Sequence, residues 1–305
     1  MAPANGLPEW LSIRPASTSS YSDIKNRVKE LGLNTVCAEA HCPNITECWS
    51  SGTATFMVLG GLCTRGCRFC AVKKSANGSA PDAEEPRKLA KAINEWGLDY
   101  IVVTSVCRDD LEDQGAGHFA ECVNEIKKLN PKTKIEVLIP DFAADTGLLR
   151  KVTDSRPDVI GHNIETVERI SPSIRDRRAS YRQSLKVLKT VKELDPGIYT
   201  KSAMMLGIGE TDDEIMRSLD DLRSAGVDFM AMGQYLRPSA AHVEVKEFVA
   251  PERFNDLRER AMAKGFLYVA AGPFVRSSYL AGDAFTTAVI GRGGSAHHVP
   301  LVAPV

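Results

Sequence analysis

Six of the eight cysteines form two triplets within one short segment of the 305-residue chain. The first triplet is spaced C-x4-C-x5-C and the second C-x3-C-x2-C. Their members are Cys37, Cys42 and Cys48 in the first, and Cys63, Cys67 and Cys70 in the second. Three thiolates suit a 4Fe-4S cluster with one iron left open, because such clusters normally take four thiolates. Two triplets therefore predict two clusters, each with a non-cysteine group on its fourth iron.

Other uses of these cysteines fit the spacing less well. Disulfides are disfavoured in a chain of this length whose first residues show no secretion signal. Neither triplet has the C-x2-C pairing of a structural zinc site, although His41 beside Cys42 could complete one. Cys107 and Cys122 stand apart from the triplets, and we expect both to be small buried core residues.

An alternation of apolar runs and helical patterns follows the triplets and predicts βα units with a parallel sheet. Apolar residues recur with helical spacing between the runs, for example Leu89, Ile93 and Trp96. Six strands are predicted, at Thr55–Gly60, Tyr100–Val106, Lys134–Ile139, Asp158–Asn163, Ile198–Leu206 and Asp228–Tyr235. Six βα units form either an open doubly wound sheet or an incomplete barrel, and periodicity alone does not choose between them.

The second triplet comes directly after the first predicted strand. Chemistry gathers at the carboxyl ends of strands in both candidate folds, so this triplet lies where an active site is expected. The segments outside the alternation, residues 1–51 and 269–305, are expected to pack across the barrel mouth. Met205-Leu206-Gly207-Ile208-Gly209-Glu210 ends a strand and opens a helix, so its backbone N–H groups are candidates for ligand contact, with a tight structural turn as the alternative.

Composition argues against two classes of function. Lys and Arg number 38 against 39 Asp and Glu, so there is no global basic field for nucleic acid. No apolar run reaches the length of about 18 residues that a membrane-spanning helix needs. The first residues lack the character of a targeting segment, which predicts a cytoplasmic protein, and a monomer is the default.

The second triplet, read as Cys63-Thr64-Arg65-Gly66-Cys67-Arg68-Phe69-Cys70, resembles the motif of the radical S-adenosylmethionine enzymes. The first triplet, within Cys37–Trp49, resembles the auxiliary-cluster motif of one family among them, the lipoyl synthases. Arg276-Ser277-Ser278-Tyr279 is similar to that family's carboxyl-terminal signature. The resemblance runs from about Pro8 to Tyr279 and includes three further segments, Arg108–Leu111, His162–Thr166 and Gln234–Pro238.

This resemblance implies an α/β fold, a partial (βα)6 TIM-like barrel of the radical S-adenosylmethionine type, with both extensions covering its mouth. The implied division is an N-terminal extension with the auxiliary-cluster cysteines at 1–51, the barrel at 52–268, and a C-terminal extension at 269–305. The tail beyond Tyr279, with His297 and His298, has no role that the resemblance explains.

The resemblance also implies the roles of individual residues. Cys63, Cys67 and Cys70 would hold a 4Fe-4S cluster whose fourth iron binds S-adenosylmethionine, so that one electron can cleave the sulfonium. The other triplet and a serine, Ser278 with Ser277 as the alternative, would hold a second 4Fe-4S cluster that serves as the sulfur source. The expected contacts to S-adenosylmethionine are Phe69, Asn163, Glu165, Gly207 and Gly209.

The implied activity is insertion of sulfur at carbons 6 and 8 of an octanoyl chain on a carrier-protein lysine. Implied partners are the octanoylated carrier domains of 2-oxoacid dehydrogenase E2 subunits and the glycine cleavage H protein, and an electron donor such as flavodoxin or ferredoxin. Arg175, Arg177 and Arg178 are either a solvated helix-start face or a docking site for an acidic carrier domain. The rival functions are another radical S-adenosylmethionine sulfur-inserting enzyme and a noncatalytic iron–sulfur carrier protein.

Overall fold

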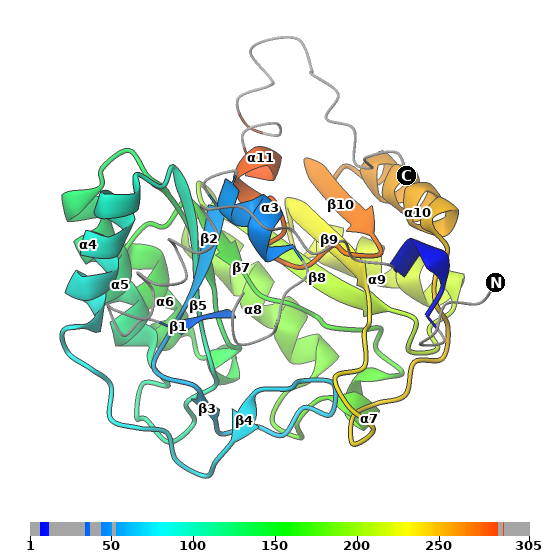
Figure 1. The fold of residues 1–305 in the computed structure, drawn as a ribbon, viewed down its shortest axis with the longest axis horizontal. Helices are drawn as coiled ribbons and strands as arrows, with labels where there is room; N and C mark the ends of the chain where they lie inside the picture. The colour runs from blue at the N-terminus through cyan, green and yellow to red at the C-terminus, as the bar shows by residue number, and fades with distance from the viewer. Residues whose placement is uncertain (1–6, 12–33, 37–43, 51–52, 286–288, 290–305) are drawn as a thin grey trace.

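The computed structural model describes residues 7–11, 34–36, 44–50, 53–285 and 289. In this part of the chain, one curved sheet of eight strands carries helices on its outer face (Figure 1). Its order is β1-β2-β5-β6-β7-β8-β9-β10, and all neighbours except β1 and β2 run parallel. The strands are β1 (Asn34–Thr35), β2 (Thr53–Val58), β5 (Tyr100–Ser105), β6 (Lys134–Leu138), β7 (Val159–Gly161), β8 (Tyr199–Leu206), β9 (Phe229–Gln234) and β10 (Tyr268–Gly272).

Amphipathic helices cover the outer face of this sheet. Their buried residues follow the predicted spacing, so that Leu89 and Ile93 of the first covering helix lie in the core. The longer helices are α4 (Glu85–Trp96), α5 (Ala116–Leu129), α6 (Thr146–Asp154), α8 (Tyr181–Leu194), α9 (Asp212–Ser224) and α10 (Pro251–Ala263). The shorter elements are η1 (Glu9–Leu11), α3 (Ile45–Ser50), β3 (Leu62–Cys63), β4 (Lys73–Lys74), η2 (Phe142–Ala144), α7 (Ser171–Ile174) and α11 (Ala281–Phe285).

All six predicted strands are present, and the parallel sheet contains a seventh that the sequence analysis missed. This strand, β10, pairs with β9 from Tyr268 to Gly272, at the start of the segment expected to be an extension. Its sequence YVAAG is short and rich in small residues, which gives a weak strand pattern. The prediction of six strands was therefore one strand short, and the alternation extends to Gly272.

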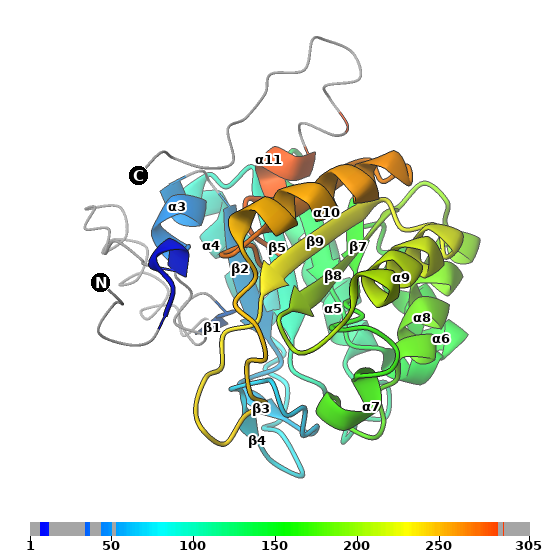
Figure 2. The same ribbon diagram turned by 90° about the vertical axis from the view of Figure 1, so that its right-hand side faces the viewer.

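The barrel is open, because β10 and β2 at its two sides are not hydrogen-bonded to each other. After β10 the chain turns back, and α11 lies at the end of the barrel where the strands begin (Figures 1 and 2). There Phe285 packs against Tyr100, Tyr199 and Phe229 with ring-centroid distances of 5.7, 5.8 and 6.5 Å. The described part of the C-terminal extension thus closes that end of the barrel. The expectation that it packs across the carboxyl ends of the strands was wrong for this part, because the turn after β10 sends the chain back along the sheet.

Small residues on three neighbouring strands make room for this returning segment. Ala203, Ala231 and Ala270 are aligned in register across β8, β9 and β10, and Val275 packs on them. A Cβ atom on Gly233, one level higher, would lie 1.9 Å from the Val275 carbonyl oxygen. Glycine is therefore required at position 233 by the close approach of the Val275 backbone.

No helix among the described residues has the length and apolar character needed to cross a membrane. The carboxyl ends of the parallel strands share one edge of the sheet, with β3, β4 and α7 beside them at the bottom of Figure 1. We call this edge the mouth of the barrel.

Candidate functional site

The second cysteine triplet lies on the loop that leaves the carboxyl end of β2. Leu59 and Gly60 have φ values of 66° and 80°, and this turn directs the chain across the mouth. Cys63 ends the short strand β3, and Cys67 and Cys70 follow before β4. The structure therefore confirms that the triplet lies at the carboxyl edge of the sheet.

Backbone hydrogen bonds hold this cysteine loop against segments that follow other strands. The N–H of Thr64 donates to the Cys107 carbonyl beyond β5 at 3.0 Å, and the N–H of Arg68 donates to the Ile174 carbonyl at the end of α7 at 2.7 Å. The N–H of Val243, beyond β9, donates to the Arg68 carbonyl at 3.1 Å. The loop is thus fixed to three sides of the mouth.

Arg65 anchors the same loop through its side chain. Its guanidinium, only 4% exposed, forms ion pairs with Asp109 at 2.7 Å and with Asp141 at 2.5 Å. These carboxylates follow β5 and β6, so one arginine ties the cysteine loop to two strand ends. The sequence analysis did not assign Arg65 a role, although an arginine between two cysteines and acidic residues just after strands were visible signals.

Backbone donors and neighbouring groups act on the thiols. The Asp176 N–H donates to Cys67 Sγ at 3.3 Å, and the Arg65 N–H donates to Cys63 Sγ at 3.5 Å. Hydrogen bonding to the Cys107 thiol is the main cause that lowers the pKa of Cys63 to about 6. Burial raises the pKa of Cys70 to about 11. Hydrogen bonds to cysteine sulfurs are one of the means by which proteins tune iron–sulfur clusters.

The contact with Cys63 corrects the expectation for Cys107. We predicted a buried core residue, but Cys107 is partly exposed and its thiol is hydrogen-bonded to the Cys63 thiol. The residue follows the end of β5 at the mouth, a position that periodicity does not reveal. Cys122 is fully buried on α5, which confirms the prediction for that residue.

The donor set of the loop fits a cluster better than a single ion. Within the described residues, no group of three His, Cys, Asp or Glu side chains is arranged to hold one metal ion. A mononuclear site brings all its sulfurs to within about 2.3 Å of one centre, whereas each thiolate of a cubic cluster binds a different iron. Three thiols on one loop with N–H donors at two sulfurs therefore suit a 4Fe-4S cluster.

Asn163 and Glu165 follow β7 at the mouth, as predicted. Glu165 has a φ of 66°, and its backbone N–H donates to the Ala203 carbonyl of β8 at 3.1 Å. Burial raises the pKa of its carboxyl, while Arg175 and a hydrogen bond from Asn163 oppose that rise. Burial is the main cause that raises the pKa of Cys67 and of Cys70, and the Glu165 charge adds to both shifts. These two polar residues therefore lie beside the cysteine loop.

The backbone N–H groups of the glycine segment after β8 have more hydrogen-bond partners within the chain than expected. The Glu210 carboxylate accepts hydrogen bonds from the N–H groups of Gly207 and Ile208, so neither donor is free for a ligand. A Cβ on Gly207 would lie 2.2 Å from the Glu247 carbonyl, which gives this glycine a packing role. Gly209 is the more open position, with only the Lys246 side chain near its missing Cβ.

Only part of the first triplet can be placed. Cys37 and Cys42 lie outside the described residues, whereas Cys48 lies buried on α3, which packs on β2. Two side-chain hydrogen bonds join this helix region to the C-terminal signature. The Tyr279 hydroxyl donates to Glu47 at 3.0 Å, and the Asn44 amide donates to the Phe274 carbonyl at 2.6 Å.

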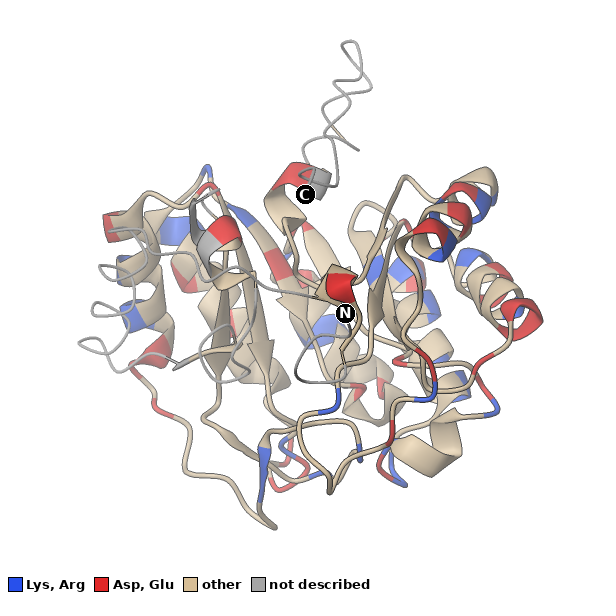
Figure 3. Ribbon diagram, turned by 45° about the vertical axis from the view of Figure 1, so that its right-hand side comes forward, with Lys and Arg blue, Asp and Glu red and all other residues tan. Residues whose placement is uncertain are grey.

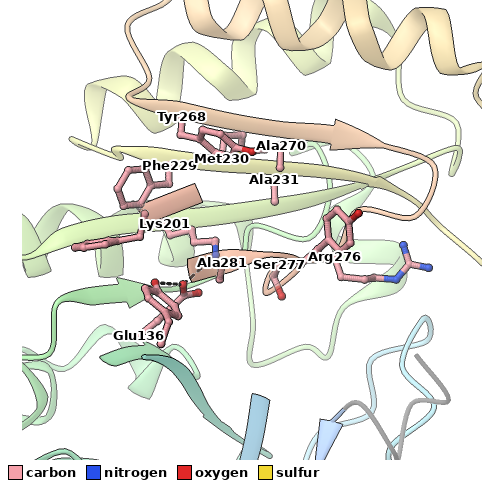
Figure 4. Close-up of a pocket in the computed structure, with 13 residues that line it drawn as sticks. Glu136, Lys201, Phe229, Met230, Ala231, Tyr268, Ala270, Arg276, Ser277 and Ala281 are labelled. Atoms are coloured by element: carbon pink, nitrogen blue, oxygen red, sulfur yellow. Dashed lines mark hydrogen bonds and ion pairs between the residues drawn. The ribbon is translucent and has the colours of Figure 1, made fainter. Parts of the chain in front are cut away.

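The two serines of the signature have different surroundings. Ser277 lines a small enclosed cavity in the barrel interior, close to Arg276 and to the Glu136–Lys201 ion pair (Figure 4). Its volume of about 10 Å³ leaves room for about one water molecule. Both serines are partly exposed, and Ser278 does not line this cavity.

The cavity has a charged wall of buried residues. Lys201 and Glu136 form an ion pair at 2.9 Å, and the Tyr100 hydroxyl donates to Glu136 at 2.8 Å. Burial and the adjacent Glu136 charge raise the pKa of Tyr100 well above its ordinary value. This paired set stabilises the interior below the mouth and involves none of the predicted site residues.

The arginine cluster divides into separate roles. Arg175 is buried and donates to the Ile164 and Ser180 carbonyls and to the Ser184 hydroxyl. Arg178 is exposed and pairs with Asp176 at 2.8 Å. Arg177 is exposed as well. The cluster is therefore neither one solvated face nor one free basic patch.

The comparison with protein families finds a match that includes the cysteine loop at the mouth. Residues 57–222 match the model of the radical SAM superfamily, a range that includes the whole second triplet. The mitochondrial lipoyl synthase of Vitis vinifera is 52% identical over 289 residues, covering 93% of this chain and 74% of that protein. The lipoyl synthase of Methanocella arvoryzae is 51% identical over 287 residues, covering 94% and 97%.

Solved structures share the fold at low sequence identity. Methylornithine synthase aligns with a TM-score of 0.52 at 14% identity, covering 82% of this chain and 74% of that chain. HydG, a maturase of the [FeFe]-hydrogenase, aligns with a TM-score of 0.56 at 15% identity, covering 83% and 62%. The fold of this chain is thus shared with both of these proteins.

Proposed function

This chain belongs to the lipoyl synthase family of the radical S-adenosylmethionine enzymes, and on that premise we propose that it inserts sulfur at carbons 6 and 8 of a protein-bound octanoyl-lysine. The observation that carries the proposal is the arrangement of its two cysteine regions. One triplet lies at the mouth, and Cys48 of the other lies on a helix joined to the C-terminal signature by the Tyr279–Glu47 hydrogen bond. A second metal centre within one chain serves an enzyme that must supply sulfur as well as a radical.

Cys63, Cys67 and Cys70 would hold the first 4Fe-4S cluster, with S-adenosylmethionine on the open iron. When bound, the cluster would supply one electron for reductive cleavage of the sulfonium, and with it radical chemistry that can remove hydrogen from a methylene. The chain positions the three thiols through the Arg65 ion pairs and the hydrogen bonds to Cys63 and Cys67. It holds them at a mouth where a substrate can approach.

Side chains at the mouth would orient S-adenosylmethionine. Asn163 and Glu165 offer an amide and a carboxylate beside the cysteine loop, and Phe69 is a partly buried ring on the loop itself. Gly209 offers backbone close to the ligand, whereas Gly207 contributes by allowing the loop from Glu247 to pack. These assignments give polar contacts for the amino acid end and an apolar surface for the adenosine end.

Cys37, Cys42 and Cys48 would hold the second 4Fe-4S cluster, which is the proposed sulfur donor. Ser278 would be its fourth and most weakly bound ligand. A serine oxygen matches iron less well than a thiolate does, which suits a cluster that is taken apart during turnover. Support comes from the bonds that bring Phe274 and Tyr279 to the region of Cys48. Ser277 faces the interior cavity instead, which favours Ser278.

Enzymes of this family act on lipoyl carrier proteins. We propose as partners the octanoylated domains of 2-oxoacid dehydrogenase E2 subunits and of the glycine cleavage H protein, with flavodoxin or ferredoxin as electron donor. A cytoplasmic location stays a prediction from the sequence, and the relatives include the mitochondrial protein of Vitis vinifera.

The test is anaerobic incubation of the reconstituted protein with S-adenosylmethionine, a reductant and an octanoyl-lysyl peptide. Mass spectrometry of the peptide is expected to show a dithiolated product, with 5′-deoxyadenosine formed in parallel. Cleavage without thiolation of this peptide would point to another radical sulfur-inserting enzyme. No cleavage by protein with its full iron content would favour a noncatalytic iron–sulfur carrier.

A further inference from the structure

Exposed basic side chains border the mouth on the side of the cysteine loop. The chain has no acidic residue between Glu47 and Asp82, while the cysteine loop and β4 within this stretch are basic. Two further segments of the mouth, after β7 and after β9, add exposed arginines. We call the following five exposed side chains the basic rim: Arg68, Lys73, Lys74, Arg177 and Arg237.

The three segments of the basic rim form one connected surface. The Arg68 guanidinium donates to the Ser173 carbonyl at 3.1 Å, four residues before Arg177. The His242 ring lies 3.2 Å from the Cys70 carbonyl, and Arg237 donates to the His242 carbonyl. Figure 3 shows blue segments along the lower edge of the molecule, where β4 and these loops lie, with red segments among them.

The cations of the basic rim are not neutralised by neighbouring carboxylates. None of the five forms an ion pair among the described residues, and the side chains of Lys73, Lys74 and Arg177 form no hydrogen bond there either. Nearby acidic residues already have other partners, since Asp176 pairs with Arg178 and Glu244 with Lys246. A chain with a net charge of −1 therefore carries a concentrated positive surface at one place.

The loop after β5, which contacts the cysteine loop through Asp109, carries several acidic residues. The loop after β5 contains Asp109, Asp110, Glu112 and Asp113 but only one cation, the buried Arg108. Arg108 pairs with Asp110 at 2.9 Å, while Glu112 is exposed. The carboxylates after β5 are thus mostly paired, Asp109 with Arg65 and Arg178 and Asp113 with Lys151, whereas the cations of the basic rim have no such partners within the described residues.

We propose that the basic rim is the docking surface for an acidic face of the protein domain that carries the acyl-lysine substrate. This proposal rests on the proposed function and specifies how the substrate is presented. Lys74 pairs in register with Cys63, so a domain bound to the rim sits directly beside the first cluster. A short tethered acyl chain can reach the mouth only from a domain held this close.

The charge pattern favours a globular acidic protein over a nucleic acid. A polyanionic strand crossing the mouth would meet the carboxylates after β5, whereas a compact domain can contact the basic rim alone. The cysteine loop has one aromatic side chain between rim cations, Phe69, and this ring packs partly buried against the core, whereas single-stranded nucleic acid stacks successive bases on several aromatic rings.

The test compares two substrates with the same reactive group, an octanoylated carrier domain and a short uncharged octanoyl-lysyl peptide. The double variant Lys73→Glu/Lys74→Glu is expected to lower kcat/KM for the domain about tenfold at low ionic strength, because rim charges steer association. The defect should shrink as salt screens the surface charges over about 10 Å at 0.1 M. Turnover of the peptide should stay within about twofold of the unmodified enzyme.

A matched control changes the net charge equally at a distance from the mouth. Lys132 and Lys186 are exposed, the first before the amino end of β6 and the second on α8, so Lys132→Glu/Lys186→Glu should behave as the unmodified enzyme on both substrates. Arg177→Glu is a second, independent probe of the rim. Equal loss on peptide and domain, or no loss on the domain, would overturn the docking proposal. If the unmodified enzyme converts neither substrate, the proposed function is refuted instead. If a short oligonucleotide inhibits turnover of the domain while the rim variants do not affect that turnover, the rim is assigned to nucleic acid.

Discussion

Single substitutions of Cys67 and Cys48, one from each cysteine triplet, should separate the chemistry of the two triplets. Cys67→Ala removes a thiol of the mouth loop and is expected to abolish 5′-deoxyadenosine formation. Cys48→Ala should leave that cleavage at least partly active while stopping sulfur insertion. Chromatography of 5′-deoxyadenosine alongside mass spectrometry of the peptide measures both. Dithiolated product from Cys48→Ala would show that the first triplet is not the sulfur source.

The two serines of the signature allow an equally direct comparison. Ser278→Ala should reduce dithiolated product strongly and change the spectrum of the second cluster, because it removes the proposed oxygen ligand. Ser277→Ala should have a small effect, since Ser277 lines the interior cavity. Electron paramagnetic resonance of the reduced protein, with product yield, reports the outcome. If Ser277→Ala has the larger effect, the ligand is Ser277.

At the residue scale, the sequence predicted the groups that we propose carry the chemistry, but not those that hold them. The cysteines, Asn163 and Glu165 were found because their spacing or their place after a strand is a local signal. Arg65, Asp109 and Asp141 act together only because the sheet brings the ends of β5 and β6 to the loop. Cys107 was misassigned for the same reason, since its contact with Cys63 depends on tertiary structure.

The N-terminus of α9 gives a prediction about pH at the scale of one element. Thr211 and Glu214 form a capping box, and the Arg169 guanidinium is the main cause that lowers the pKa of Glu214 to about 2. A lowered pKa stabilises the fold above the ordinary value of 4.5, and this contribution is lost as the pH falls towards 2. Glu214→Gln should therefore lower the free energy of unfolding by about 1 kcal/mol at pH 7.

Urea denaturation at several pH values measures this effect. The difference between Glu214→Gln and the unmodified protein should narrow as the pH is lowered below the ordinary value of 4.5. Glu121→Gln is the control, because Glu121 is exposed on α5 and forms no ion pair within the described part of the chain. A difference that stays constant with pH would contradict the role of the Glu214 charge.

Substitution of Gly233 on β9 tests how the C-terminal segment packs against the sheet. Gly233→Ala would drive a Cβ into the Val275 carbonyl, so it should destabilise the fold by about 3 kcal/mol and displace the signature. Dithiolated product should fall more than 5′-deoxyadenosine formation. Gly272→Ala is the matched control at the same level of β10, where the nearest atom is Val275 Cγ2 at 3.4 Å. Equal effects of both variants would show that the close packing of the Val275 backbone on Gly233 does not determine product formation.

At the element scale, strong periodicity decided what could be predicted. The six strands with long β-branched or apolar runs were all found, and the helix around Leu89 and Ile93 was found from its spacing. β10 was missed because its alanines and glycine carry little strand signal, and because no amphipathic helix follows it. The return of the chain into the open barrel depends on the alignment of Ala203, Ala231 and Ala270, which a linear pattern does not show.

At the scale of the whole molecule, a nearly neutral chain gathers five exposed cations on the basic rim of one mouth. Net charge alone concealed this rim, although the acid-free stretch between Glu47 and Asp82 was visible in the sequence. Three parts of the molecule that the proposed reaction requires lie at or near the mouth. The cysteine loop lies at its edge, the signature segment returns beneath it, and the basic rim lies beside the first triplet.

The most direct test of the whole account is the origin of the inserted sulfur. The clusters of the protein are rebuilt with heavy-isotope sulfide, excess sulfide is removed, and a single turnover on the octanoyl-lysyl peptide is analysed by mass spectrometry. The account predicts a dithiolated peptide in which both sulfur atoms carry the heavy isotope. A dithiolated peptide with light sulfur, or labelled product from a protein without Cys48, would contradict it.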